Sequence, residues 1–380
     1  MSKPPKIKIL HLITGLDLAG SQMMLVNLLR GMNRERFDSV VVSLQDGGPR
    51  RSEVESMSIP VFSLGVGRGV PNPAGLLRLL RLVRRERPDV LQSWLYHADL
   101  LGLVAARMSR VPACAWNIRT SDMDMARYST ISRLVFASLP WLSRYPDVVV
   151  VNSDAGRKLH ESLNFRPRRW RLIPNGFDLD RFHPDPRARA RLRRQIGAPN
   201  SFLIGLVARY DPMKDHLTFL TAAARFRTSR PDARFVLAGG DIDSENKTLS
   251  RMINDLGLSD AVDLLGERDD IESVIAALDI LALSSTAEGF PNCIGEAMAC
   301  GVPGVTTDVG DAAILVGDTG RVVPVRDPDA LADAWSQLYE MGEEARVELG
   351  MSARRRIEES FSLPSIVRQY EDLYERLVSV

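Results

Sequence analysis

The run from 280 to 303 decides the fold and reads ILALSSTAEGFPNCIGEAMACGVP. Its first four residues, Ile280–Leu283, are all apolar and predict a buried strand. Gly289 and Pro291 then interrupt the chain and exclude a continuous helix. Asn292 is a candidate N-cap for the helix that follows, and the glycine before the final Val-Pro suits the left-handed residue after a helix. The run therefore predicts a strand, a loop and a helix in succession.

Two carboxylates flank the interruption in this run. Glu288 lies in the loop after the strand, and Glu296 lies in the first turns of the next helix. The start of a helix offers unpaired backbone N–H groups and a positive dipole end, which favour an anion such as a diphosphate. The two carboxylates can accept hydrogen bonds from hydroxyl groups beside that anion. The pattern predicts a sugar nucleotide as ligand, although two glutamates at this spacing also occur often by chance.

The rest of the chain alternates apolar runs with longer amphipathic segments. This alternation predicts parallel strands connected by helices, with helices on both faces of each sheet. The strands expected in the first half are Ile7–Ile13, Phe37–Leu44, Pro60–Leu64, Val90–Trp94, Ala113–Ile118, Val148–Asn152 and Arg171–Ile173. Those expected in the second half are Phe202–Ala208, Ala233–Ala238, Val262–Leu265, Ile280–Leu283 and Gly304–Thr306.

The two blocks of alternation predict two domains in this chain of 380 residues. The polar, arginine-rich segment Asp178–Ala198 is the expected linker, which divides the chain into domains at 1–185 and 186–362. The tail 363–380 has apolar residues at near-helical spacing and predicts an amphipathic helix. Ligands of such sheets bind at the carboxyl ends of the strands, so we expect the site in a cleft between the domains.

Composition and charge exclude several classes of protein. The net charge of +1 argues against a bulk nucleic-acid binder, and 45% hydrophobic residues are typical of a soluble globular protein. Cys114, Cys293 and Cys300 are too few and too scattered for a disulfide framework or a metal site. No run approaches the ~20 apolar residues that span a bilayer. We therefore expect a cytoplasmic protein from a reducing compartment.

Two segments of the first half combine basic and apolar residues. Five arginines occur close together around the segment Pro73–Arg85, which has helical spacing. The segment Met123–Leu142 interleaves Leu, Phe and Trp with arginine. One interpretation is a peripheral contact with anionic lipid at the inner face of a membrane. The other is a solvated helix face for the first segment and a core helix for the second, and the sequence leaves both open.

The Glu288-to-Glu296 run resembles the E-x7-E signature of retaining family 4 glycosyltransferases, with Gly-Phe-Pro-Asn inside it and Ala-Met-Ala-Cys-Gly-Val-Pro after it. The resemblance implies an α/β protein with the GT-B fold, in which two doubly wound Rossmann-like domains face a central cleft. It also implies that the last helix, 363–380, crosses back onto the N-terminal domain. Catalysis in this family is independent of metal ions, so no cofactor and no metal site are expected.

The same resemblance implies roles for individual residues. Arg209 and Lys214 are similar to the pair of cations that hold the donor diphosphate, where negative charge builds up during transfer. Glu296 would bind ribose hydroxyls, Glu288 the hydroxyls of the transferred sugar, and His97 would contact that sugar. Arg119 is a candidate on the acceptor side. The other expected donor-binding residues are Gly20, Gly239, Arg268, Gly289, Phe290, Pro291 and Asn292.

Each of these residues also has a structural interpretation. A surface ion pair explains Arg209 or Lys214 taken alone, and ordinary turn chemistry explains Gly239 and Arg268 equally well. A lone histidine such as His97 is usually structural.

The predicted function is a retaining glycosyltransferase that moves a sugar from a nucleotide diphosphate, with UDP favoured, to a lipid-linked or glycan acceptor in bacterial surface polysaccharide synthesis. The alternatives are a sugar-nucleotide epimerase of the same fold and a non-catalytic sugar-nucleotide-binding subunit.

Overall fold

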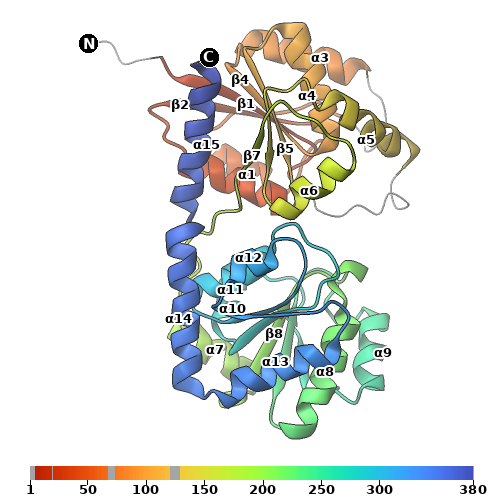
Figure 1. Ribbon diagram of the computed structural model, residues 1–380, viewed down its shortest axis with the longest axis vertical. Helices are drawn as coiled ribbons and strands as arrows, with labels where there is room; N and C mark the ends of the chain where they lie inside the picture. Colours follow the sequence, from red (N-terminus) through yellow and green to blue (C-terminus); the bar gives the residue numbers. More distant parts are fainter. Residues whose placement is uncertain (1–4, 19, 67–72, 120–128, 380) are drawn as a thin grey trace. The chain divides into compact units, whose positions relative to one another are not determined.

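The computed structural model describes residues 5–18, 20–66, 73–119 and 129–379 (Figure 1). The chain forms two compact units, one made of Met1–Gly176 with Leu363–Val380, the other of Phe177–Ser362. Both units are parallel α/β structures, and we describe each by itself. Among the described residues no helix combines the length and the apolar character needed to cross a membrane.

The first unit contains a parallel sheet with the strand order β3-β2-β1-β4-β5-β6-β7. Its strands are β1 Ile7–Ile13, β2 Phe37–Ser43, β3 Val61–Ser63, β4 Val90–Trp94, β5 Ala113–Ile118, β6 Val148–Val151 and β7 Trp170–Leu172. Ile13 at the end of β1 pairs with Ser43 and with Trp94, so the carboxyl ends of three neighbouring strands meet at one edge. The predicted strands of the first half are confirmed to within one or two residues at each end.

Helices cover both faces of this sheet. They are α1 Gly20–Gly31, α2 Arg51–Ser56, α3 Pro73–Glu86, α4 Tyr96–Ser109, α5 Thr130–Leu142, α6 Asp154–Ser162 and α15 Leu363–Val378. One apolar cluster joins α1 and α15 to one face, and a second joins α3 and α4 to the other. Tyr370 of α15 is fully buried in the first cluster and accepts a hydrogen bond from Asn117 Nδ2 at 3.0 Å.

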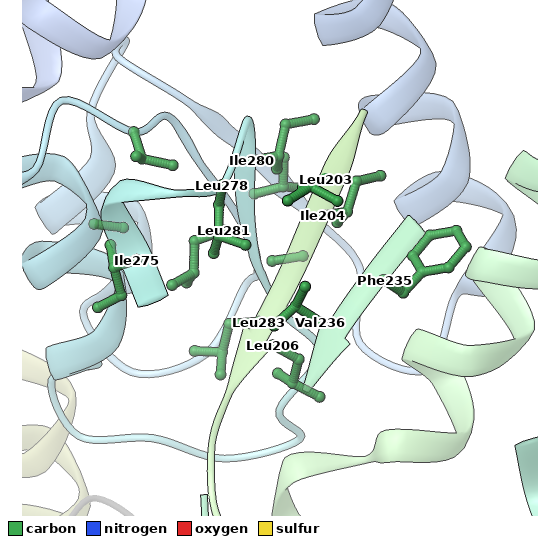
Figure 2. Packing of buried hydrophobic residues seen from close by; sticks show 14 of the residues in the cluster. Leu203, Ile204, Leu206, Phe235, Val236, Ile275, Leu278, Ile280, Leu281 and Leu283 are labelled. Atoms are coloured by element: carbon green, nitrogen blue, oxygen red, sulfur yellow. The ribbon is translucent and has the colours of Figure 1, made fainter. Parts of the chain in front are cut away.

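The second unit repeats the architecture with the strand order β10-β9-β8-β11-β12-β13. Its strands are β8 Leu203–Val207, β9 Arg234–Ala238, β10 Val262–Leu264, β11 Ile280–Leu283, β12 Gly304–Thr307 and β13 Arg321–Val323. Figure 2 shows the apolar side chains of β8, β9 and β11 in its core. The helices are α7 Pro186–Gln195, α8 His216–Ser229, α9 Lys247–Asp255, α10 Ile271–Ala276, α11 Asn292–Ala299, α12 Ala312–Val316, α13 Pro328–Glu340 and α14 Glu343–Ser360, with a 3-10 turn η2 at Pro212–Lys214.

The expected linker at 178–198 is wrong in one respect, because it contains the helix α7. Two of its arginines are not solvated as expected. Arg189 and Arg193 both contact the carboxylate of Asp279, at 2.5 and 2.6 Å, just before β11. Arg193 also donates to the carbonyl oxygen of Ala277 at 2.9 Å, so α7 is fastened to the base of the second sheet. The division between the units falls at Gly176, nine residues before the boundary we expected.

Candidate functional site

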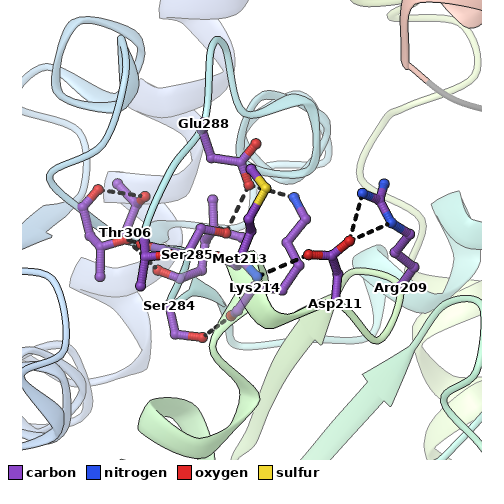
Figure 3. Close-up of polar contacts among 11 residues, drawn as sticks. Arg209, Asp211, Met213, Lys214, Ser284, Ser285, Glu288 and Thr306 are labelled. Carbon is purple, nitrogen blue, oxygen red and sulfur yellow. Dashed lines mark hydrogen bonds and ion pairs between the residues drawn. The ribbon is translucent and has the colours of Figure 1, made fainter. Parts of the chain in front are cut away.

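The carboxyl edge of the second sheet carries most of the residues singled out from the sequence. β8 lies between β9 and β11, and β11 lies between β8 and β12. The loop after β8 carries Arg209 and Lys214, the loop after β11 carries Glu288, and α11 begins immediately beyond it at Asn292. The fold therefore brings residues about 75 positions apart to the same edge (Figure 3).

Lys214 and Glu288 form the central contact of this edge. Nζ of Lys214 donates to Oε1 of Glu288, and the two side chains are only 18% and 14% exposed. Ser285 Oγ donates to the same carboxylate oxygen at 2.7 Å. The ammonium group of Lys214 and the hydroxyl of Ser285 thus contact the same oxygen of the Glu288 carboxylate.

A set of buried hydroxyls holds the two loops in place. Ser284 Oγ donates to the carbonyl oxygens of Lys214 and Asp215, at 2.8 and 3.0 Å. Thr307, at the end of β12, donates to the carbonyl oxygen of Ser285 at 2.6 Å. The three hydroxyl-bearing residues are fully buried. The sequence did not single them out for a function, because a serine or threonine in a run gives no periodic signal.

Arg209 differs from Lys214 in its surroundings. Its guanidinium contacts Asp211 at 3.0 Å, and its side chain is 61% exposed. Asp211 also caps the turn η2, since its other carboxylate oxygen accepts from the backbone N–H of Met213 at 2.9 Å. Arg209 therefore lies at the exposed end of the row of side chains in Figure 3, where an anionic ligand can approach it.

Gly310 fixes the backbone of the Glu288 loop. A Cβ at this position would lie 2.2 Å from the carbonyl oxygen of Glu288, and its φ of +56° is a conformation that side chains disfavour. The next residue, Asp311, donates its backbone N–H to the carbonyl oxygen of Gly289 at 3.0 Å. The segment after β12 thus packs directly against the loop that carries the carboxylate, a role that the sequence left undefined.

The second carboxylate, Glu296, occupies α11 as predicted. It is half-buried, and burial raises the pKa of its carboxyl group to about 7. The positive charge of Arg181 opposes this shift, and the negative charge of Glu272 adds to it. Arg181 is itself held by Glu272 at 2.9 Å. Cys293, one turn before Glu296, has a thiol pKa raised to about 12, chiefly by burial, so it is no thiolate nucleophile.

The start of α11 departs from one expectation. The residue at the N-cap position is Pro291, and Asn292 is the first helical residue, so Asn292 is not the N-cap. Phe290 is buried and faces Phe177 and Phe361, with ring centroids 6.3 and 5.7 Å away. Its side chain belongs to the core, which leaves only its backbone for a ligand. The glycine after α11 has φ of +71°, which confirms the predicted helix end.

Two other predicted donor-binding residues, Gly239 and Arg268, make close contacts within the second unit. A Cβ on Gly239 would lie 2.3 Å from the carbonyl oxygen of Ala208, so this glycine is needed where β9 passes the end of β8. Arg268 makes a two-pronged contact with the carboxylate of Asp270, at 2.8 and 2.9 Å. No contact described here tests their predicted roles, which stay predictions.

In the first unit, His97 lies in the first turn of α4, directly after β4. Its Nε2 is 3.2 Å from Ser132 Oγ, and burial lowers the pKa of its imidazole. Arg119 follows β5, where it donates to Asn117 and Tyr370, each at 3.2 Å. It therefore links the sheet to α15, and its predicted acceptor-side role remains untested.

The remaining predicted residues of this unit are placed as follows. Gly20 is the first residue of α1. The start of the segment Met123–Leu142 lies outside the described residues. Within the described ranges, no three His, Cys, Asp or Glu side chains gather in a way that would hold a metal ion.

Family models match the two halves of the chain. One described as Glycosyltransferase Family 4 matches residues 18–181, and one described as Glycosyl transferases group 1 matches residues 201–341. Among curated proteins, the chain is 24% identical to the UDP-Gal:alpha-D-GlcNAc-diphosphoundecaprenol alpha-1,3-galactosyltransferase of Escherichia coli, over 98% of both chains. It is 32% identical to D-inositol 3-phosphate glycosyltransferase of Corynebacterium urealyticum, over 61% of this chain and 57% of that protein.

Solved structures show the same architecture. Anabaena Alr3699/HepE in complex with UDP superposes with a TM-score of 0.84 and 24% identity, covering 97% of this chain and all of that one. Sucrose-phosphate synthase from Thermosynechococcus elongatus superposes with a TM-score of 0.80 and 20% identity, covering 98% and 99%. These likenesses extend over both units.

Proposed function

Because the chain belongs to the GT-B glycosyltransferases matched by the family 4 and group 1 models, we propose that it is a retaining enzyme that transfers a sugar from a UDP-sugar to a lipid-linked or glycan acceptor. The observation that carries the proposal is the Lys214–Glu288 pair at the carboxyl edge of the second sheet, beside the start of α11. A cation and a helix start at one edge can hold the diphosphate of the donor, and a carboxylate beside them can accept hydrogen bonds from the hydroxyls of the sugar.

The geometry supports a division of labour within the donor site. When the donor binds, the ammonium group of Lys214 can move from Glu288 to an oxygen of the diphosphate. A hydroxyl of the sugar can then donate a hydrogen bond to the carboxylate of Glu288. Arg209, exposed at the same edge, adds a second cation to the diphosphate. Glu296 lies within α11 and is assigned to the ribose hydroxyls. Each charged group then exchanges one polar partner for another, which avoids leaving a buried charge unpaired.

The transfer step that we propose is the one that the family resemblance implies. The bond between the anomeric carbon and the diphosphate oxygen breaks as the acceptor oxygen bonds to the same face of the sugar. The proton of the acceptor hydroxyl passes to the departing phosphate oxygen, and the cations stabilise the charge that develops on the diphosphate. UDP is favoured as the carrier, since two of the similar proteins are named for UDP or hold it. Synthesis of a bacterial surface polysaccharide is the pathway that best matches the Escherichia coli relative.

The first test is a thermal-shift screen against UDP-, GDP- and ADP-sugars. A true donor at ~100 times its Kd adds about 2.7 kcal/mol of stability, and the other nucleotides add little. The second test measures transfer of sugar from UDP-galactose or UDP-glucose to GlcNAc-diphospholipid. NMR of the product then gives its anomeric configuration. An inverted product refutes retention. Conversion of the donor sugar without acceptor would instead favour an epimerase.

We further propose that the first unit contacts an anionic bilayer through α5 and α3. Helix α5 buries only Leu139, while Leu134 and Trp141 are 67% and 61% exposed. Arg144 lies 5.1 Å above the Trp141 ring, and α3 exposes arginines along its outer face, among them Arg81. Apolar and basic side chains on one surface are complementary to anionic lipid, at about 1 kcal/mol per basic residue. A lipid-linked acceptor would require such an approach.

Vesicle sedimentation tests this surface. Binding should rise with anionic lipid and fall with salt, because the attraction decays over a Debye length of about 8 Å at physiological ionic strength. The double variant Leu134→Ser/Trp141→Ser should lose most of the binding. Leu217→Ser is the matched control, since Leu217 is comparably exposed on α8 of the second unit. Equal sedimentation of both variants would refute the assignment of α5, and no binding at low salt would favour a soluble acceptor.

A further inference from the structure

Helix α5 reaches the turn that carries His97. Two of its residues one turn apart, Ser132 and Phe136, contact consecutive residues at the start of α4. Ser132 Oγ lies 3.2 Å from Nε2 of His97, and the Phe136 ring packs edge-on against Tyr96 at 5.1 Å. The exposed residues of α5 lie on its other side. Helix α5 thus has one side exposed to solvent, and on its other side the hydroxyl of Ser132 contacts His97, a predicted site residue.

The backbone of this turn is held independently of α5. Leu95, just before it, has φ of +74°, which a leucine adopts only where its surroundings enforce it. The buried carboxyl group of Asp99 accepts from Ser93 Oγ at 2.6 Å and so ties α4 to the end of β4. The position of the His97 ring is therefore largely set by the main chain, and its orientation and protonation are what Ser132 can influence.

Two serine hydroxyls and the His97 ring form a row of hydrogen-bonding groups. Ser129 is the N-cap of α5, and its Oγ accepts from the backbone N–H of Ser132 at 3.2 Å. The two serine hydroxyls are 3.0 Å apart. Each carries one proton. Both directions fit these distances: Ser129 can donate to Ser132 and Ser132 to Nε2 of His97, or the ring can donate to Ser132 and Ser132 to Ser129.

We propose that Ser132 is a positioning residue for His97: its hydroxyl donates to Nε2 and holds the neutral ring with its proton on Nδ1, where it can donate to an oxygen of the transferred sugar. The inference rests on the proposed function and on the role that the family resemblance implies for His97, contact with the transferred sugar. Burial lowers the pKa of His97, which keeps the ring neutral near pH 7. Within the described part of the chain, Nδ1 has no hydrogen-bond partner. The nitrogen that Ser132 leaves alone is therefore the one available to a ligand.

Nitrogen NMR of the 15N-histidine-labelled protein tests the contact directly. The chain has five histidines, so the His97 signals are identified by their loss in His97→Gln. We expect the wild type and Ser132→Thr to carry the proton on Nδ1, and Ser132→Ala to shift it towards Nε2. Ser138→Ala is the matched control, because the Ser138 hydroxyl donates a hydrogen bond to the carbonyl oxygen of Val135 within α5. An unchanged tautomer in Ser132→Ala overturns the inference.

Turnover in a double-mutant cycle tests its consequence. The readout is UDP release from UDP-galactose with GlcNAc-diphospholipid in vesicles. Loss of one hydrogen bond predicts a kcat about three- to tenfold lower for Ser132→Ala, with Ser132→Thr close to wild type. His97→Ala/Ser132→Ala should be no slower than His97→Ala. Losses that add independently overturn the inference. If His97→Ala turns over like the wild type while the tautomer shift persists, the role of His97 in the proposed function is what fails.

Discussion

Replacing Lys214 with methionine separates the two parts that this residue plays. The side chain neutralises Glu288 in the ligand-free protein, and it is assigned to the donor diphosphate during transfer. Methionine keeps most of the apolar stem and removes the charge. The variant therefore removes the Lys214 ammonium group from the carboxylate of Glu288 and keeps the contact with Ser285.

The structure sets the expected size of both effects. Removing one partner of a buried ion pair costs about 3–5 kcal/mol. Since both side chains keep some exposure, we expect roughly 2 kcal/mol, or about 4–8 °C in the Tm of a unit of this size. Turnover should fall about 100- to 1000-fold, the usual loss when one group that stabilises developing charge is removed.

A second variant distinguishes the two effects. Lys214→Met/Glu288→Gln carries no uncompensated charge, so its Tm should recover towards the wild type while its turnover stays low. Thermal unfolding followed by circular dichroism and UDP release from UDP-galactose supply the two readouts. Lys247→Met, at an exposed lysine on α9, is the control for loss of one positive charge. A double variant as unstable as the single one refutes the unpaired-carboxylate argument, and turnover within threefold of wild type in Lys214→Met refutes the diphosphate assignment.

Three further outcomes follow from the same edge of the sheet. Burial raises the pKa of Glu296 to about 7, above its ordinary value of 4.5, so the wild type should lose stability as pH rises through about 7. Glu296→Gln should not show this loss of stability. If Tm depends on pH in the same way in the wild type and in Glu296→Gln, the prediction is wrong. Gly310→Ala should lower Tm and turnover together, because its Cβ meets the carbonyl oxygen of Glu288; an unchanged Tm would contradict this. Transfer should persist in excess EDTA, and activity lost on chelation but restored by Mg²⁺ would refute metal independence.

The sequence predicted the sheets well because their strands are buried on both faces. Such strands are continuous apolar runs, as in Ile280–Leu283, and the pattern needs no knowledge of neighbours. β13 was missed because it has only three residues and begins with an arginine. Helix α7 was missed for the opposite reason. Its arginines are typical of a solvated segment, and the carboxylate that pairs with them, Asp279, lies more than 80 residues away.

The candidate site shows the same division between local and distant information. Glu288, Glu296 and the start of α11 lie within one short run, so the sequence could place them relative to one another. The pairing of Lys214 with Glu288 requires β8 and β11 to be neighbours, which the order of elements along the chain does not reveal. The role of the buried Ser285 hydroxyl can be recognised only once that pair is known, because the hydroxyl donates to the same oxygen of Glu288 that Lys214 contacts. A donor that binds here as proposed changes the contacts of both members of this ion pair, so we expect its diphosphate and its sugar to contribute jointly to affinity.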